Sequence, residues 1–173
     1  MSDRELELTS NQLLIIKTDL SGKFTYCNQQ FIELTEYKEN ELLGQSLQMI
    51  YHTDMPSGIN HLLWKTLKEK REFTFFFKFK TKTKTKTGAF CWSFANMTPF
   101  YSVTGSVTGY TCSFRAPNSA ATMMFGMYYE QMKEQEQGQT PEKGAQLSLQ
   151  LLTDLLSATG DDYEASVFKL QFS

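Results

Sequence analysis

The sequence predicts an α+β domain in which short helices cover one face of a five-stranded antiparallel sheet, followed by a carboxy-terminal helical extension. Phenylalanine occupies alternate positions from Phe73 to Phe79, which is the period-two pattern of a strand with one apolar face. Strand-like segments follow at Ala89–Pro99 and Val107–Arg115, which predicts antiparallel pairing. After Pro117 the composition changes from strand-like to helix-like.

The amino-terminal part predicts a polar lead and a hairpin. Residues 1–10 are polar and indicate little beyond a possible short helix. The apolar run Leu13–Ile16 and the alternating run Phe24–Cys27 are typical of two strands, and the turn residues Asp19–Gly22 lie between them. Asn28 follows as a candidate N-cap of a short helix, because its side chain can accept a hydrogen bond from a first-turn amide. Such short helices need a sheet to lie on.

The stretch Tyr51–Pro56 is predicted to begin a longer helix that covers the sheet. A proline at a helix start costs no hydrogen bond, because the first amides have no partner inside the helix. Asp54 is placed to accept from those free amides. Apolar residues then recur at helical spacing: Ile59, Leu62, Leu63 and Leu67. We therefore expect His52 and Asp54 to lie at the mouth of a helix whose apolar stripe faces the sheet.

The phenylalanine strand has a second, basic face. Lysine occupies the even positions from Lys78 to Lys86, and the repeat Lys80–Thr87 has β propensity but nothing to bury. We expect this repeat to form a hairpin tip that turns near Gly88. A solvated edge that discourages pairing with other sheets is favoured over a contact with nucleic acid or anionic lipid.

The segment after Pro117 predicts helices that need a cover. The methionine-rich segment Asn118–Gln137 indicates a partly amphipathic helix, and Gly138–Gly144 has the composition of a linker. A second helical stripe follows: Leu147, Leu151, Leu152 and Leu155. No strand remains to cover these faces, so they fold back over the outer face of the sheet or meet a second copy. We favour the homodimer.

The composition excludes several classes of protein. The 173 residues suffice for one domain with an appendage, and the net charge of −2 argues against a general nucleic-acid binder. Cys27, Cys91 and Cys112 are far apart, which disfavours a disulfide framework or a zinc site. The sequence shows neither a signal-peptide core nor an apolar run of membrane-span length. We expect a cytoplasmic protein without direct membrane insertion.

Four separated segments resemble one known family, in the family's order. Thr18–Asn28 is similar to the first hairpin of PAS sensors. His52–Lys68, Trp92–Pro99 and Gly109–Arg115 resemble the PAS domain of bacterial aerotaxis receptors. The resemblance covers about residues 10–117 and implies the PAS fold. We therefore divide the chain into a lead, a PAS sensor domain and a helical tail: residues 1–10, 11–117 and 118–173.

The resemblance also implies a function and a site. PAS domains of this kind bind FAD non-covalently, sense redox state and signal to a chemotaxis transducer. Four residues match the positions that would hold the flavin: Asn28, His52, Asp54 and Trp64. Four other positions depart from the family's pattern. Tyr51 stands where the family has arginine, Thr53 where it has proline, Phe73 where it has tryptophan and Phe79 where it has asparagine. The loss of a cation and an amide removes directional contacts that a pyrophosphate and an isoalloxazine ring would use.

Two alternatives to FAD remain open. The first is a ligand-free aromatic core that serves as a dimerisation or protein-interaction module. The second is a haem, for which His52 and His61 are the only histidines, although a solvated or backbone-bonding histidine is favoured at both positions. A blue-light photoadduct is excluded, because residues 44–51 contain no cysteine.

Catalysis is not expected. The sequence has neither a GxSxG nucleophile signature nor a glycine-rich phosphate loop, and its carboxylates are scattered. The prediction is a cytoplasmic sensor, without a metal site, that acts on a chemotaxis-type or other signalling protein.

Overall fold

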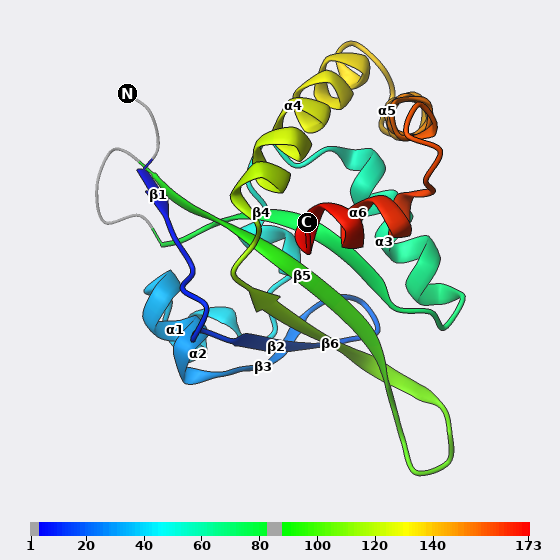
Figure 1. Ribbon diagram of the computed structural model, residues 1–173. Helices are drawn as coiled ribbons and strands as arrows, with labels where there is room; N and C mark the ends of the chain where they lie inside the picture. Colours follow the sequence, from blue (N-terminus) through cyan, green and yellow to red (C-terminus); the bar gives the residue numbers. More distant parts are fainter. Residues whose placement is uncertain (1–3, 83–87) are drawn as a thin grey trace.

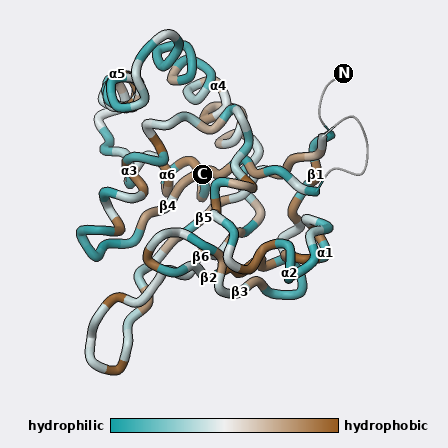
Figure 2. The backbone as a smooth tube through the Cα atoms, turned by 180° about the vertical axis from the view of Figure 1, so that it is seen from behind, coloured by the Kyte–Doolittle hydropathy of each residue, from teal (hydrophilic) through white to brown (hydrophobic). Residues whose placement is uncertain are grey.

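A six-stranded mixed sheet forms the centre of the computed structural model, which describes residues 4–82 and 88–173 (Figure 1). The strands are β1 (Arg4–Leu6), β2 (Leu14–Asp19), β3 (Phe24–Cys27), β4 (Phe73–Lys80), β5 (Ala89–Tyr101) and β6 (Val107–Arg115). Neighbours follow the order β4, β5, β6, β2, β3, and β1 pairs with the first residues of β5. The β5–β6 hairpin projects from the rest of the chain in Figure 1 and Figure 2. Most of the predicted Lys-Thr hairpin tip, residues 83–87, lies outside the described residues.

Strand β1 corrects two predictions, the polar lead with a possible helix and the purely antiparallel five-stranded sheet. Arg4–Leu6 pairs in parallel with Ala89–Cys91. Strand β6 pairs with β5 only from Phe94 onward, so β1 satisfies backbone groups of β5 that β6 does not reach. A strand of three mostly exposed residues has no apolar alternation, and the sequence therefore carries no signal for it.

Short helices cover one face of the sheet, the inner face, as predicted. They are α1 (Gln29–Thr35), α2 (Glu39–Leu42), the 3-10 helix η1 (Leu47–Ile50) and α3 (Ser57–Lys68). Each contributes a fully buried apolar side chain: Phe31, Leu42, Ile50 and Leu63. Burying a side chain of this size stabilises the fold by roughly 1.5–3 kcal/mol, which exceeds what these short helices supply by propensity.

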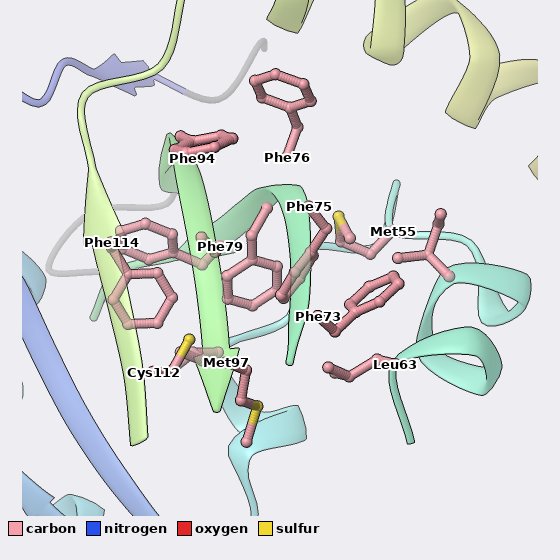
Figure 3. Close-up of a cluster of buried hydrophobic side chains, with 14 of the residues drawn as sticks. Met55, Leu63, Phe73, Phe75, Phe76, Phe79, Phe94, Met97, Cys112 and Phe114 are labelled. Carbon is pink, nitrogen blue, oxygen red and sulfur yellow. The ribbon is translucent and has the colours of Figure 1, made fainter. Parts of the chain in front are cut away.

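The interior between this face and the helices is filled by phenylalanine. The buried rings come from four elements of the fold, β3, α1, β4 and β6: Phe24, Phe31, Phe73, Phe75, Phe77, Phe79 and Phe114. The rings of Phe77, Phe79 and Phe114 have centroids 5.5–5.8 Å apart, so they are in direct contact. Figure 3 shows Phe79 and Phe114 side by side. The apolar odd face predicted for residues 73–79 is confirmed. We call this group of seven rings the phenylalanine interior.

The even face of β4 is buried as well, which differs from the basic face that the sequence predicts. Phe76 is fully buried and Thr74 nearly so. Phe76 pairs with Phe94 of β5, and Figure 3 shows both rings on the opposite side of the strands from Phe79. The basic face therefore begins only at Lys78, and the sheet has an apolar outer face that needs its own cover.

The tail forms three helices, of which the first and the last provide that cover. The three helices are α4 (Ser119–Glu136), α5 (Pro141–Ser157) and α6 (Tyr163–Gln171), and they group together beside β4 and β5 (Figure 1). The ring of Phe125 on α4 lies 4.8 Å from that of Phe76, and Phe168 on α6 lies 5.9 Å from Phe94. Of the two arrangements considered for the tail, the chain adopts the one docked on its own sheet. None of the described helices is both long enough and apolar enough to span a membrane.

Helix α5 differs from the prediction in its start and in its buried face. It begins at Pro141, inside the predicted linker, because the Thr140 hydroxyl accepts from the Lys143 amide at 3.3 Å and proline suits the first helical position. Its buried residues are Gly144, Ala145, Ser148, Leu152 and Leu156. Of the predicted leucine stripe, only Leu152 is among them, because the contact with α3 and α4 selects small residues that the stripe pattern ignores.

We predict that Phe76→Ala lowers the free energy of unfolding by about 3–5 kcal/mol, because it leaves a cavity between β4 and α4. The matched control is Phe100→Ala, whose ring is 48% exposed and whose loss should change stability far less. Urea unfolding of both variants measures the difference. Equal effects would contradict the docking of the tail on this face.

Candidate functional site

The Asn28 side chain has a structural role, because its hydrogen bonds are to the backbone of neighbouring segments. Its Oδ1 accepts from the backbone amides of Ile15 and Phe31, both at 3.1 Å, and its Nδ2 donates to the carbonyl of Leu13 at 2.9 Å. The side chain therefore caps α1 and ties that helix to β2. The predicted cap is confirmed, and these bonds occupy both ends of its amide.

Trp64 packs against the turn of the first hairpin. Its Nε1 donates to Asn60 Oδ1 at 3.1 Å, and its ring meets Tyr110 edge-on at 5.6 Å. It also covers Gly22, which has a φ of +79°, and a Cβ at that glycine would lie 2.8 Å from the indole. These contacts hold the hairpin turn against α3.

His52 and Asp54 are the two predicted residues that come together, and they do so at the edge of β4. The backbone amide of His52 donates to the carbonyl of Lys78 at 3.2 Å. The His52 ring packs edge-on against Phe90 at 5.3 Å, and its Nδ1 accepts from the Asp54 amide at 3.1 Å. Phe90 pairs with Lys80, so this cluster lies toward the outer side of the sheet.

Lys78 completes this group. Its ammonium donates to Asp54 Oδ2 at 2.6 Å and lies 4.0 Å from the ring centroid of Phe90, with only 12% of the side chain exposed. Burial would raise the pKa of Asp54, but the hydrogen bond from Lys78 and the charge of its ammonium hold that pKa below its ordinary value of 3.8. Asp54 is therefore ionised and paired near neutral pH.

Asp54 does not cap α3, which corrects the prediction. The helix begins at Ser57, with Pro56 as its N-cap and no capping bond from that side chain. Instead, Glu136 of α4 accepts from the Gly58 amide at 3.1 Å and from the Ser148 hydroxyl of α5 at 2.8 Å. Burial would raise the pKa of Glu136, but the hydroxyls of Ser148 and Ser57 and the amides at the helix start hold it below 4.5. One carboxylate thus joins α3, α4 and α5.

The interior, as packed, does not fit an isoalloxazine ring system. Phe31 stacks on both Phe79 and Phe114 with centroids 6.4 and 5.9 Å apart, which is ordinary packing distance. The four predicted flavin residues do not converge on this space. The one polar anomaly is Tyr51, whose hydroxyl is buried without a hydrogen-bond partner among the described residues. Burial raises the pKa of this phenol, and its ring meets Phe77 edge-on at 4.9 Å.

The interior does not fit a haem either. His61 is exposed on α3, and His52 packs against Phe90, outside the phenylalanine interior. Neither imidazole is in position to supply an axial ligand to a group bound there.

Sequence reasoning missed three residues of the outer side: Lys78, Trp92 and Glu136. The sequence pattern places Lys78 on a solvated basic face. In the structure it pairs with Trp92 across β4 and β5, as the strand register requires. Glu136 gave no signal, because its partner Gly58 is 78 residues away in the sequence.

Comparisons with known sequences agree with the resemblance. The family model described as a PAS domain matches residues 11–115. The aerotaxis receptor of Escherichia coli (strain K12) is 29% identical over 110 residues, which are 64% of this chain and 21% of the receptor. The chain therefore spans about a fifth of that relative's length.

Solved structures share the fold at low identity. A light-oxygen-voltage domain studied with a flavin analogue has a TM-score of 0.57 at 18% identity, covering 69% of this chain and 88% of that one. The LOV domain of the blue-light photoreceptor aureochrome1 has a TM-score of 0.54 at 10% identity, covering 70% and 84%. The PAS domain of the fruit-fly ELK potassium channel has a TM-score of 0.51 at 18% identity, covering 60% and 85%.

We predict that Glu136→Gln destabilises the fold at neutral pH by about 1–3 kcal/mol, because hydrogen bonds to a charged acceptor are replaced by bonds to a neutral one. The folded-state pKa of Glu136 lies below its ordinary value of 4.5, so the unfolded chain binds the proton more readily. The advantage of the wild type is therefore complete above that value and is lost as pH falls through the lower, folded-state pKa. Urea unfolding across acidic pH tests this, with exposed Glu130→Gln as the control. A constant difference at all pH values would refute the role of the charge.

Proposed function

The chain belongs to the PAS domain family and has the PAS fold, and from this premise we propose that it is a non-catalytic sensory module that passes a signal from its sheet to helices α4–α6. One observation carries the proposal. Strand β4 packs against the other rings of the phenylalanine interior through Phe77 and Phe79 and against α4 of the tail through Phe76. Its first residue, Phe73, stacks on Tyr163 of α6. A displacement of this strand would therefore change the packing on both faces of the sheet.

Hydrogen bonds join the tail to the backbone of the same strand. The Tyr129 hydroxyl of α4 donates to the carbonyl of Phe76 at 2.8 Å. The Tyr163 hydroxyl of α6 donates to the carbonyl of Thr74 at 3.1 Å. These bonds are directional, so a change in the twist of β4 would weaken them before the apolar contacts separate.

The proposal assigns roles along the chain. Residues 11–117 would be the sensor, residues 118–173 the transmitter and residues 1–10 a lead. Identity to an aerotaxis receptor supports a chemotaxis-type partner and a cytoplasmic location. Met123 and Met127 on α4 are 72% and 60% exposed, and they support a homodimer, which stays a prediction.

We predict that Phe77→Leu, a change on the inner face of β4, raises the rate of amide hydrogen exchange in α4 and α6 several-fold. The matched control is Phe24→Leu, because both rings are buried but β3 lies at the opposite edge of the sheet. Each substitution should cost about 1–3 kcal/mol of global stability. Exchange measured by mass spectrometry that rises equally in both variants would show that β4 has no special role.

A second candidate function is redox sensing through non-covalently bound FAD. It is supported by the identity to an aerotaxis receptor and by the fold shared with a light-oxygen-voltage domain studied with a flavin analogue. Asn28, His52, Asp54 and Trp64 stay predictions as flavin contacts. The interior rings are in contact and, among the described residues, leave no space for an isoalloxazine ring system, and we therefore place this candidate second.

We predict that the purified protein is colourless and does not gain a flavin absorption band after incubation with FAD and removal of the free cofactor. Tyr51→Phe provides a second readout. It should stabilise the protein by about 1 kcal/mol or more, because it removes a buried hydroxyl without a partner among the described residues. A yellow protein that loses its flavin in the Tyr51→Phe variant would establish the second candidate instead.

A further inference from the structure

We propose that a hollow between α4 and the outer face of β4 and β5 binds a small zwitterion of the α-amino-acid class that carries a flat apolar side chain. The hollow has a volume of about 520 Å³, which is within the roughly 300–1,000 Å³ typical of small-molecule sites. It lies on the opposite side of the sheet from the phenylalanine interior. The proposal is therefore independent of what the interior binds.

An aromatic floor suits the flat side chain. Trp92 lines the hollow and stacks on Tyr129 with centroids 6.0 Å apart and planes at 30°. The Tyr129 hydroxyl donates to the carbonyl of Phe76, which fixes that ring and, through it, the indole. A rigid, partly exposed indole offers a stacking surface that loses little entropy when a ligand binds.

Gly126 keeps the space above this floor open. It lies in the middle of α4, where glycine destabilises a helix relative to alanine. Packing does not require it, because the nearest atom to an added Cβ would be Trp92 Cζ2 at 3.8 Å, an ordinary contact. Larger side chains at this position would project over the indole. An open floor accounts for a glycine that the local packing leaves unexplained.

The charges around the hollow indicate a zwitterion. Lys78 and Asp54 form a fixed ion pair on the sheet side, and the Lys78 ammonium has donors left after binding Asp54. The helix side supplies Glu130, Glu134 and Lys133, whose side chain is 42% exposed and whose ammonium lies 3.6 Å from the Glu136 carboxylate. A simple anion would meet three carboxylates, and a simple cation would meet two ammonium groups. A ligand with one group of each sign can pair with both.

The site would join two parts of the molecule. Its walls come from β4 and β5 on one side and from α4 on the other. A ligand bound there would hold the tail to the sheet and stabilise the docked arrangement by mass action.

Calorimetric titration of the full chain with three related probes tests the proposal. Phenylalanine, phenethylamine and 3-phenylpropionate share a ring and a short chain but are a zwitterion, a cation and an anion. We expect saturable binding of phenylalanine, or of another aromatic amino acid, and at least about tenfold weaker binding of the amine and the acid. Equal or tighter binding of either single-charge probe overturns the zwitterion assignment. Absence of binding by every aromatic amino acid overturns the site.

Variants locate the site. Gly126→Leu should abolish binding by filling the hollow, while Gly126→Ala, which makes only the 3.8 Å contact, should retain most of it and stabilise the helix. Lys78→Met should weaken binding by about tenfold or more, whereas Lys65→Met, at an exposed position on α3, should leave it unchanged. Circular dichroism and urea unfolding establish that each variant is folded. Unchanged affinity in folded Gly126→Leu would place the ligand elsewhere.

Discussion

Strand β4 is buried on both faces although it lies at the edge of the sheet, and this constraint determines most of the structure. An open edge next to two apolar faces would invite pairing with another chain. The stretch after η1 prevents it: Tyr51 forms a bridge with Phe79, the His52 amide donates to the Lys78 carbonyl, and the Lys78 amide donates to Met55 Sδ at 3.4 Å. The segment that resembles a flavin-binding motif thus has a structural role as the cover of this edge.

The same constraint explains the interior. With both faces of β4 occupied, space for a ligand would have to come from smaller or polar side chains on its odd positions. Phe79 stands at one such position, fully buried against Phe31 and Phe114. An asparagine there would need hydrogen-bond partners, whereas phenylalanine closes the space by contact alone. The Tyr51 hydroxyl has no hydrogen-bond partner within the described part of the chain, which costs roughly 1–3 kcal/mol, and the surrounding ring contacts offset this cost.

The sequence could predict what depends on local pattern. The alternation at residues 73–79, the turn at Gly22 and the Asn28 cap each have a short-range cause, and each is found in the structure. The errors have long-range causes. The lysines at even positions predict a solvated face, so the burial of Phe76 on that face is not predicted. The helix that covers Phe76 comes about fifty residues later in the sequence. Asp54 has the right chemistry for a cap, but its carboxylate pairs with Lys78 across the strand edge. The sequence could not predict which of the four site residues lie close together in space, because a motif match gives residue identities and not distances between side chains.

Glu136 adds a second connection between the two layers that enclose the sheet. Its carboxylate lies at the amino-terminal end of α3, where the helix dipole favours a negative charge, and it also accepts from Ser148 of α5. Helix α3 covers the inner face, and α5 packs against α4 of the outer cover, so Glu136 links the two covers around the edge of β4. A signal could then travel through the strand by packing or around it by electrostatics. The two routes differ physically, because acidic pH weakens the bonds of Glu136 but leaves the contact of Phe76 with Phe125 unchanged. Acidic pH therefore distinguishes the link through Glu136 from the packing of Phe76 on Phe125.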